Sequence, residues 1–243
     1  MIDRAPPRLY VTPALAQGLR LDLSPEHTHY LANVMRRRAG DEVLVFNGVD
    51  GEWRASITEL AKRTVTLELQ GQSRTQDTAV DVWLMFAPIK RQRVDLVAEK
   101  ATEMGASRLQ PVITRRTNAE RVNLGRLQAH AVEAAEQCGI LNVPRVMTPQ
   151  PLERLLGEWD VARRILFCDE SGVAPPAREV LGRGSRGPWA VLVGPEGGFD
   201  EAERAMLNAM PCAGAASLGP RILRADTAAV AALALFQAAL GDW

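Results

Sequence analysis

Hydrophobic and polar residues alternate with two different periods along this chain, and the period changes near residue 75. Strand-like alternation occupies residues 8–11 and 43–69, where Asn-Gly and Asp-Gly pairs are typical of turns between strands. Residues 24–38 begin with Ser24-Pro25, a serine cap followed by proline at the first helical position. These patterns predict a small N-terminal β-barrel that carries one helix.

From residue 80 onward, apolar runs of strand length alternate with segments of helical period. The predicted strands are residues 80–87, 109–113, 143–147, 163–168, 189–193 and 214–218. The predicted helices are residues 92–104, 123–138, 151–158, 200–210 and 226–240. This alternation predicts an α/β domain whose mostly parallel sheet has helices on both faces. The polar stretch 73–79 is predicted to link a first domain, residues 1–72, to a second, residues 80–243.

Composition and charge narrow the class of protein. A chain of 243 residues suits one large or two small domains. No run approaches the roughly 20 apolar residues of a membrane span, and the start of the chain has no apolar signal core. We therefore expect a cytoplasmic protein without membrane contact. The three cysteines lie far apart and show no metal-ligand spacing, so we expect no metal.

Two glycine-bearing loops follow short apolar runs in the second half of the chain. Residues 192–198 read Leu-Val-Gly-Pro-Glu-Gly-Gly, and residues 217–228 read Ser-Leu-Gly-Pro-Arg-Ile-Leu-Arg-Ala-Asp-Thr-Ala. Glycine lets a backbone approach a ligand closely, and proline stiffens a loop. No Lys-Ser or Lys-Thr follows the glycines, which excludes a P-loop, and the dinucleotide fingerprint is absent. We expect the two loops to wall a small-molecule pocket with backbone groups.

These two segments resemble the RsmE family of 16S ribosomal RNA uridine-N3 methyltransferases, in the knotted SPOUT superfamily. His29 to Arg36 with Gly40-Asp41 looks like the N-terminal segment of that family, and Glu136-Gln137-Cys138-Gly139 looks like its mid-chain element. The resemblance spans nearly the whole chain. It implies a PUA-like RNA-binding β-barrel, followed by a SPOUT domain with a trefoil knot, in which residues 226–240 pass through the preceding loop. It also implies a homodimer.

The resemblance further implies that the two loops and the end of the 163–168 strand bind S-adenosylmethionine. The aliphatic residues among them would suit the flat adenine ring. The expected cofactor-binding residues are Phe167, Leu192, Gly194, Glu196, Gly197, Gly198, Leu218, Gly219, Ile222 and Leu223.

Four charged residues in these loops are candidates for catalysis. Arg221 and Arg224 are hard to explain as core, because arginine is rarely buried without a partner. Their planar guanidinium groups suit a phosphate or the target base, but each could equally be a surface arginine paired to an acid such as Asp226. Glu196 and Asp226 are candidates for a base. Asp226 stands where the family more often has glutamate, which shortens the reach of its carboxylate.

Short basic clusters are the candidates for RNA contact. The residues that we single out are Arg4, Arg8, Arg36, Arg38, Lys90 and Arg91. Lysine and arginine supply most phosphate contacts, which position RNA without reading its sequence. Such clusters are also common on solvated surfaces, and the chain carries 29 basic and 29 acidic residues. A net charge of zero counts mildly against nucleic-acid binding. Only a local cluster of basic residues could provide a positive surface for RNA. Ile140 stands where the family commonly has a basic residue, so no RNA contact is transferred to it.

The function expected from the resemblance is transfer of a methyl group from S-adenosylmethionine to N3 of a uridine in ribosomal RNA or the small ribosomal subunit. Two alternatives stay open. A related knotted methyltransferase could act on another RNA position or on transfer RNA, and a non-catalytic RNA-binding protein could keep the same fold. The intact glycines at positions 194, 197, 198 and 219 argue against loss of activity.

Overall fold

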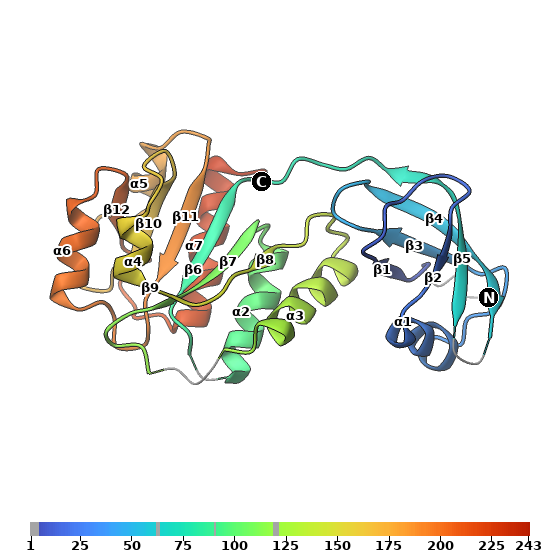
Figure 1. Cartoon of the computed structure of the whole chain (residues 1–243). Coiled ribbons are helices and arrows are strands. Elements are labelled where there is room, and N and C mark those ends of the chain that lie inside the picture. The colour runs from blue at the N-terminus through green and yellow to red at the C-terminus, as the bar shows by residue number, and fades with distance from the viewer. Residues whose placement is uncertain (1–4, 62–63, 90, 119–121) are drawn as a thin grey trace. The chain divides into compact units, whose positions relative to one another are not determined.

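The chain divides into two compact units. A computed structural model describes residues 5–61, 64–89, 91–118 and 122–243 (Figure 1). The first unit comprises Met1–Thr78 together with Ala135–Asn142, and the second comprises Ala79–Ala134 and Val143–Trp243.

The first unit is built on a curled sheet with the strand order β1-β3-β4-β5-β2 (Figure 1). Its strands are β1 (Arg8–Tyr10), β2 (Arg20–Asp22), β3 (Glu42–Phe46), β4 (Glu52–Leu60) and β5 (Val65–Arg74). β1 and β3 run parallel, and the other pairs are antiparallel. Alternate residues such as Val43 and Val45 are fully buried in its core, as period-two patterning predicts. The predicted barrel is thus an open half-barrel with β1 and β2 at its ends.

Three local features of this unit differ from the sequence prediction. β2 was not predicted, because three residues are too few to give a periodic pattern. The helix predicted at 24–38 is a short α1 (Pro25–His29) that continues into the π-helical turn η1 (Tyr30–Val34). It ends early because Arg36 adopts a left-handed backbone with φ of 53°. β5 extends to Arg74, so it overlaps the start of the expected linker.

The second unit holds a sheet with the strand order β12-β10-β11-β6-β7-β8, in which neighbouring strands are parallel. Its strands are β6 (Val82–Phe86), β7 (Arg108–Ile113), β8 (Arg145–Val146), β9 (Gln150–Pro151), β10 (Arg164–Cys168), β11 (Trp189–Val193) and β12 (Ala213–Ala216), with β9 paired to β7. Its helices are α2 (Arg91–Glu103), α3 (Leu124–Gln137, which ends in the first unit), α4 (Leu152–Gly157), α5 (Ala177–Gly182), α6 (Glu201–Ala209) and α7 (Ala225–Leu240).

Side chains from this sheet enter two hydrophobic cores, one on each face. Leu84 and Val191 pack with residues of α2, α5 and α7, including Phe236. Met85 and Phe167 pack with residues of α4 and α6. This arrangement confirms the predicted parallel sheet with helices on both faces. The expected passage of 226–240 through the preceding loop stays a prediction. No helix in the described ranges is both long and apolar enough to span a membrane.

Three elements of the second unit were predicted poorly. α5 and β9 were missed, because six and two residues are too few to show a period. β8 has two residues instead of the predicted 143–147. Pro144 precedes it directly, and proline has no N–H to donate to a sheet ladder.

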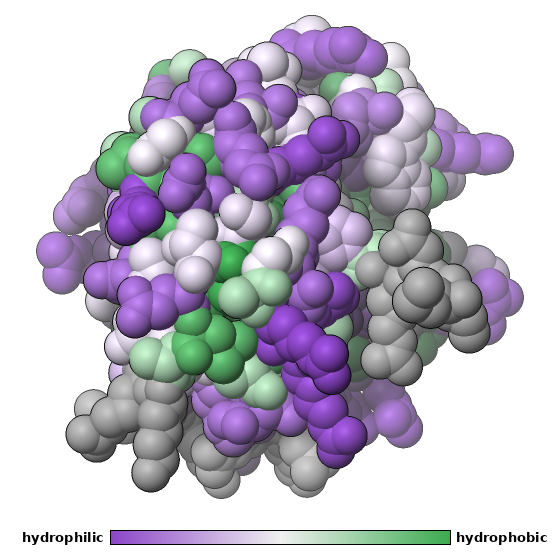
Figure 2. All heavy atoms as spheres, turned by 90° about the vertical axis from the view of Figure 1, so that its right-hand side faces the viewer, coloured by the Kyte–Doolittle hydropathy of each residue, from purple (hydrophilic) through white to green (hydrophobic). Residues whose placement is uncertain are grey.

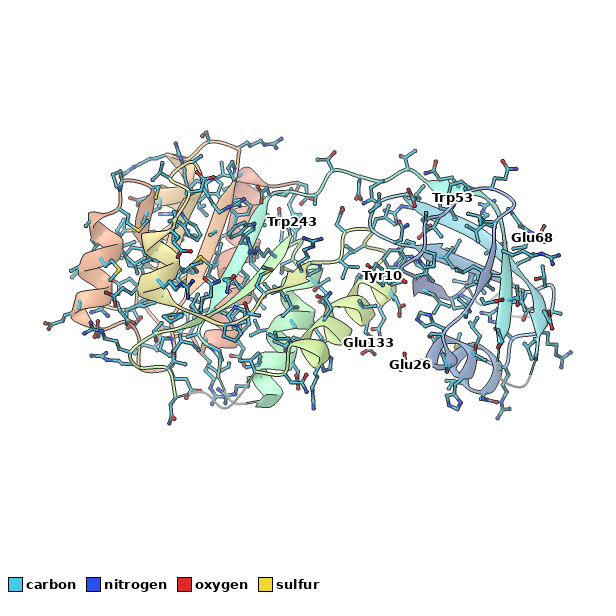
Figure 3. All side chains as sticks on the ribbon, viewed as in Figure 1. Tyr10, Glu26, Trp53, Glu68, Glu133 and Trp243 are labelled. Atoms are coloured by element: carbon cyan, nitrogen blue, oxygen red, sulfur yellow. The ribbon has the colours of Figure 1, made fainter. Side chains whose placement is uncertain are left out.

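Arg8 ties together three parts of the first unit. Its Nε donates to Glu52 Oε2 at 2.7 Å, and its Nη1 donates to the carbonyl oxygens of Ala135 and Glu136 at 2.7 and 2.8 Å. The guanidinium also lies 4.5 Å from the centroid of the Phe46 ring. The neighbouring Tyr10 (Figure 3) donates its backbone N–H to Glu136 Oε1 at 2.8 Å. Arg8 therefore joins β1, β4 and the segment Ala135–Asn142.

We predict that Arg8→Gln destabilises the first unit by roughly 2–3 kcal/mol, because Glu52 would keep a buried carboxylate without its main partner. Urea unfolding followed by circular dichroism and fluorescence measures the change. Arg20→Gln is the matched control, since Arg20 forms an exposed pair with Glu68 at 3.6 Å. Its effect should stay below about 1 kcal/mol. Equal unfolding midpoints for the two variants would contradict the structural role of Arg8.

Candidate functional site

A cavity of about 630 Å³ opens where β10, β11 and β12 end. Carboxyl ends of parallel strands are the usual place for a ligand in an open α/β sheet, and the volume is typical of small-molecule sites. The cavity is lined by Cys168, Asp169, Glu170, Gly172, Ala174 and Pro176, by residues 193–196, and by residues 216–225 with Ala228. Three loops and the start of α7 thus enclose one space.

The alternation of side chains decides which strand residues reach the cavity. Cys168, Val193 and Ala216 stand at the ends of three neighbouring strands and line it. Phe167 and Leu192 are fully buried in the core on the other face of the sheet, and neither lines the cavity. These two expected cofactor residues therefore lie beneath the site rather than in its wall.

The first glycine loop is a tight turn of defined shape. A Cβ on Gly194 would lie 3.1 Å from the Phe199 ring, so any other residue would require that ring to shift by a few tenths of an ångström. Gly198 has a φ of 66°, a conformation that favours glycine, and its N–H donates to the carbonyl of Pro195 at 2.8 Å. The carbonyl of Gly197 accepts from Arg116 Nη1 at 2.8 Å. Of the predicted loop residues, Gly194 lines the cavity and Gly197 and Gly198 do not.

Charged groups hold this loop from both sides. Glu196 lines the cavity and forms an ion pair with Arg93 at 3.0 Å. Asp200 caps α6 in a reciprocal capping box with Glu203, whose Oε1 also accepts from the backbone N–H of Arg115 at 2.8 Å. The hydrogen bond from the Glu203 backbone, opposed by partial desolvation and reinforced by the Arg115 charge, keeps the pKa of Asp200 below its ordinary value.

The loop after β10 contributes an acidic wall that the sequence prediction missed. Asp169 is buried and accepts from Arg204 Nε at 3.0 Å, while Glu170 accepts from Arg204 Nη2 at 3.1 Å. Both carboxylate residues line the cavity. The signal that could have found them is an acidic pair directly after a buried strand. Burial, reinforced by the charge of Glu170, raises the pKa of the Cys168 thiol to about 12, so this thiol stays protonated.

The second glycine loop carries two exposed arginines, Arg221 and Arg224. Gly219 has a φ of 116°, and its N–H donates to Ser217 Oγ at 3.2 Å. Ile222 is 86% exposed at the cavity rim, which is unusual for a large apolar side chain. Arg221 and Arg224 also line the cavity and are exposed. Within the described ranges, neither guanidinium forms an ion pair.

The alternative considered for these arginines, an ion pair with Asp226, does not form among the residues that the structure describes. Asp226 lies in the first turn of α7, where its Oδ1 accepts from the backbone N–H of Thr227 at 2.9 Å. Asp226 does not line the cavity. Arg224 is the N-cap residue of α7, and its carbonyl accepts from Ala228 at 2.7 Å. Of the two catalytic carboxylate candidates, the structure brings only Glu196 to the cavity.

The residues expected to contact RNA have different environments. Arg36 and Arg38 are exposed in the first unit. The side chain of Arg8 is 13% exposed, pairs with Glu52 and donates to two carbonyl oxygens. Its role is therefore structural rather than in RNA contact. Arg4, Lys90 and the side chain of Arg91 lie outside what the structure describes. Figure 2 shows a mainly hydrophilic face with apolar residues in small patches.

In the described part of the chain, no group of three or more His, Cys, Asp or Glu residues is arranged to hold a metal.

Two family descriptions match this chain. An RNA methyltransferase domain matches residues 76–237, and an RNA methyltransferase PUA domain matches residues 23–70. The chain is 31% identical to ribosomal RNA small subunit methyltransferase E of Rickettsia conorii over 233 residues, which cover 93% of each chain. It is 33% identical to the protein of the same name from Synechocystis over 240 residues, 96% of this chain and 78% of the relative.

Solved structures of similar proteins share the whole fold. The ribosomal RNA small subunit methyltransferase E of Neisseria gonorrhoeae, bound to S-adenosyl methionine, is 28% identical with a TM-score of 0.90. A methyltransferase of Legionella pneumophila in complex with the bound cofactor SAM is 27% identical with a TM-score of 0.88. Each match covers 98% of this chain and 99% of the other.

Proposed function

We propose that this chain, which belongs to the family of ribosomal RNA small subunit methyltransferases E, transfers a methyl group from S-adenosylmethionine to N3 of a uridine in 16S ribosomal RNA. The observation that carries the proposal is the cavity at the strand ends, which both glycine loops wall and which bears two arginines without an ion pair among the described residues. Two similar solved structures hold S-adenosylmethionine, which supports the choice of methyl donor.

The residues of the cavity fit this donor. Half-buried Leu218 and Leu223 supply aliphatic walls for an adenine ring. The backbone N–H groups of Ile222 and Leu223 make no internal hydrogen bond within the described ranges, so they can donate to a ligand. The carboxylates of Asp169 and Glu170 have the sign that complements a positively charged sulfur or amine. We assign donor binding to Gly194, Glu196, Leu218, Gly219, Ile222 and Leu223. Phe167 and Leu192 lie in the core beneath them, and Gly197 and Gly198 shape the loop that carries Glu196.

When bound, S-adenosylmethionine supplies a methyl group activated by the positive sulfur to which it is attached. The protein must then make N3 of uracil nucleophilic, because this nitrogen carries a proton at neutral pH. Arg221 and Arg224 can stabilise the anion left by that proton, which is shared with the neighbouring oxygens of the ring. Glu196 is the base candidate that reaches the cavity. Burial raises the pKa of the Cys168 thiol, so we give this residue no part in the transfer.

The remaining parts of the proposal concern partners and place of action. The exposed Arg36 and Arg38 on the first unit are suited to RNA phosphates. The match to a PUA domain of RNA methyltransferases, residues 23–70, lies within the first unit, which supports a role of this unit in holding ribosomal RNA. We further propose that the protein works in the cytoplasm as a homodimer, as the resemblance of its sequence to the RsmE family implies.

The function is tested on small ribosomal subunits from a strain that lacks the gene. The subunits are incubated with the protein and a methyl-labelled donor, and the RNA is digested to nucleosides for mass spectrometry. We expect 3-methyluridine at a single position. Label in another nucleoside, or in transfer RNA instead, would indicate a related methyltransferase. Binding of the RNA without any label would indicate a non-catalytic RNA-binding protein.

We predict that Gly219→Ala weakens donor binding at least about tenfold, because a side chain at its φ of 116° strains the loop that walls the cavity. Isothermal calorimetry measures the affinity. Gly187→Ala is the matched control, since Gly187 has a φ of 148°, equally open surroundings and no place in the cavity. Both variants should melt at similar temperatures. Equal donor affinity in the two variants would show that the second glycine loop does not bind the methyl donor.

We predict that Arg224→Ala lowers the single-turnover methylation rate by about 10²–10³, because a charge at the developing anion is lost. Donor and RNA affinity should change far less, since the interaction strengthens in the transition state. Higher pH should partly restore the rate by helping N3 to ionise. Arg178→Ala is the control, because Arg178 is exposed and does not line the cavity. A rate within about threefold of the unmodified protein would exclude the catalytic role.

A further inference from the structure

A cluster of arginines surrounds Trp83 in the second unit. The guanidinium carbon of Arg108 lies 4.0 Å from the centroid of the Trp83 ring, and that of Arg163 lies 3.8 Å from it. Arg163 also forms a bidentate pair with Asp81, with N–O distances of 2.8 and 2.7 Å. Stacking on an aromatic ring holds a guanidinium plane in one orientation while its edge stays free to donate. Trp83 thus fixes the position of Arg108 before any ligand binds.

Arg145 adds a third positive charge beside Arg108. The two arginines are register partners on the adjacent parallel strands β7 and β8. Asp81 is committed to Arg163, and neither Arg108 nor Arg145 pairs with a carboxylate among the residues that the structure describes. Like charges on neighbouring strands destabilise a sheet unless something between them neutralises the repulsion. Burial, followed by the charges of Arg163 and Arg145, lowers the pKa of Arg108.

One donor in the cluster lacks an acceptor. The Nε of Arg108 is buried, and it has no hydrogen-bond partner among the residues that the structure describes. A buried N–H without an acceptor is destabilising, so natural structures seldom keep one without a reason. Arg108 begins β7, whereas the cavity lies at the carboxyl ends of strands in the same parallel sheet. The cluster therefore lies at the opposite edge of that sheet and is not part of the cavity (Figure 1).

We propose that Arg108 and Arg145 form a phosphate-binding site, and that the phosphate belongs to the backbone of the RNA substrate. Arg108 and Arg145 are register partners on adjacent parallel strands, so their side chains leave the same face of the sheet and can donate charge-assisted hydrogen bonds to one phosphate. A phosphate between them would cancel the repulsion that the sheet otherwise bears. The choice of RNA as its source rests on the function proposed above, whereas the site itself does not.

The first experiment uses inorganic phosphate and the full chain without RNA or methyl donor. Phosphate should raise the melting temperature of the unmodified protein more than chloride at equal ionic strength. Arg145→Gln should abolish this difference, and without phosphate it should melt no lower than the unmodified protein, because a repulsion is removed. Arg183→Gln is the control, since Arg183 is 78% exposed and caps α5 on the other face of the sheet. The same phosphate effect in both variants would overturn the site.

The second experiment measures RNA affinity against salt concentration. Loss of one phosphate contact should reduce the log–log slope by roughly 0.7–0.9 for Arg145→Gln, and Arg183→Gln should leave it unchanged. Arg108→Gln added to Arg145→Gln should cost less affinity than it does alone, because both residues would hold the same phosphate. An unchanged slope with a retained phosphate effect would overturn RNA as the source and point to a free phosphate compound. If the protein binds phosphate at Arg108 and Arg145 but methylates no RNA, the proposed function is refuted and the phosphate site is still supported.

Discussion

The parallel pairing of β10 with β11 on one side and β12 on the other is the constraint on which the site depends. Parallel strands end at the same edge, so loops that are distant in sequence meet there. The register matters as much as the pairing. Cys168 faces the cavity and Phe167 faces the opposite core, and a slip of one residue would exchange them. The same pairing therefore fixes both the lining of the cavity and the core beneath it.

Sequence patterns could predict the parts of this site that depend on local chemistry. Gly198 and Gly219 have a positive φ, a conformation that favours glycine, so the glycine in the sequence already indicates a turn at each position. The acidic pair Asp169 and Glu170 directly follows a buried strand, which is a local signal, but its approach to Arg204 of α6 depends on the packing of the folded chain. The pair between Arg93 and Glu196 joins residues of α2 and the first glycine loop, and no local pattern indicates it.

The arginines show why basic clusters alone do not identify an RNA surface. Arg8 belongs to such a cluster, yet its guanidinium pairs with Glu52 and donates hydrogen bonds to backbone carbonyl oxygens. Arg108 and Arg145 are far apart in sequence and belong to no common basic run, yet they are register partners on adjacent strands, and neither forms an ion pair with a described carboxylate. Whether an arginine can bind a phosphate depends on the carboxylates that folding brings to it. Because the chain has equal numbers of acidic and basic residues, only the folded structure tells which arginines have a carboxylate partner and which do not.

The chemistry proposed for the cavity depends on positive charge held in place rather than on a strong base. Arg224 is the N-cap residue of α7, so the positive end of a 16-residue helix adds to its own charge. Because α7 packs on the core through residues such as Ala232 and Phe236, this charge is held by the body of the unit as well as by the loop. Groups fixed in this way need no rearrangement when the uracil ring becomes anionic. A positive field that stabilises the anion also makes the proton easier to remove, which lowers the demand on any base. The missing pair between Arg224 and Asp226 then has a physical meaning, because a guanidinium neutralised by a neighbouring carboxylate would lose most of this effect.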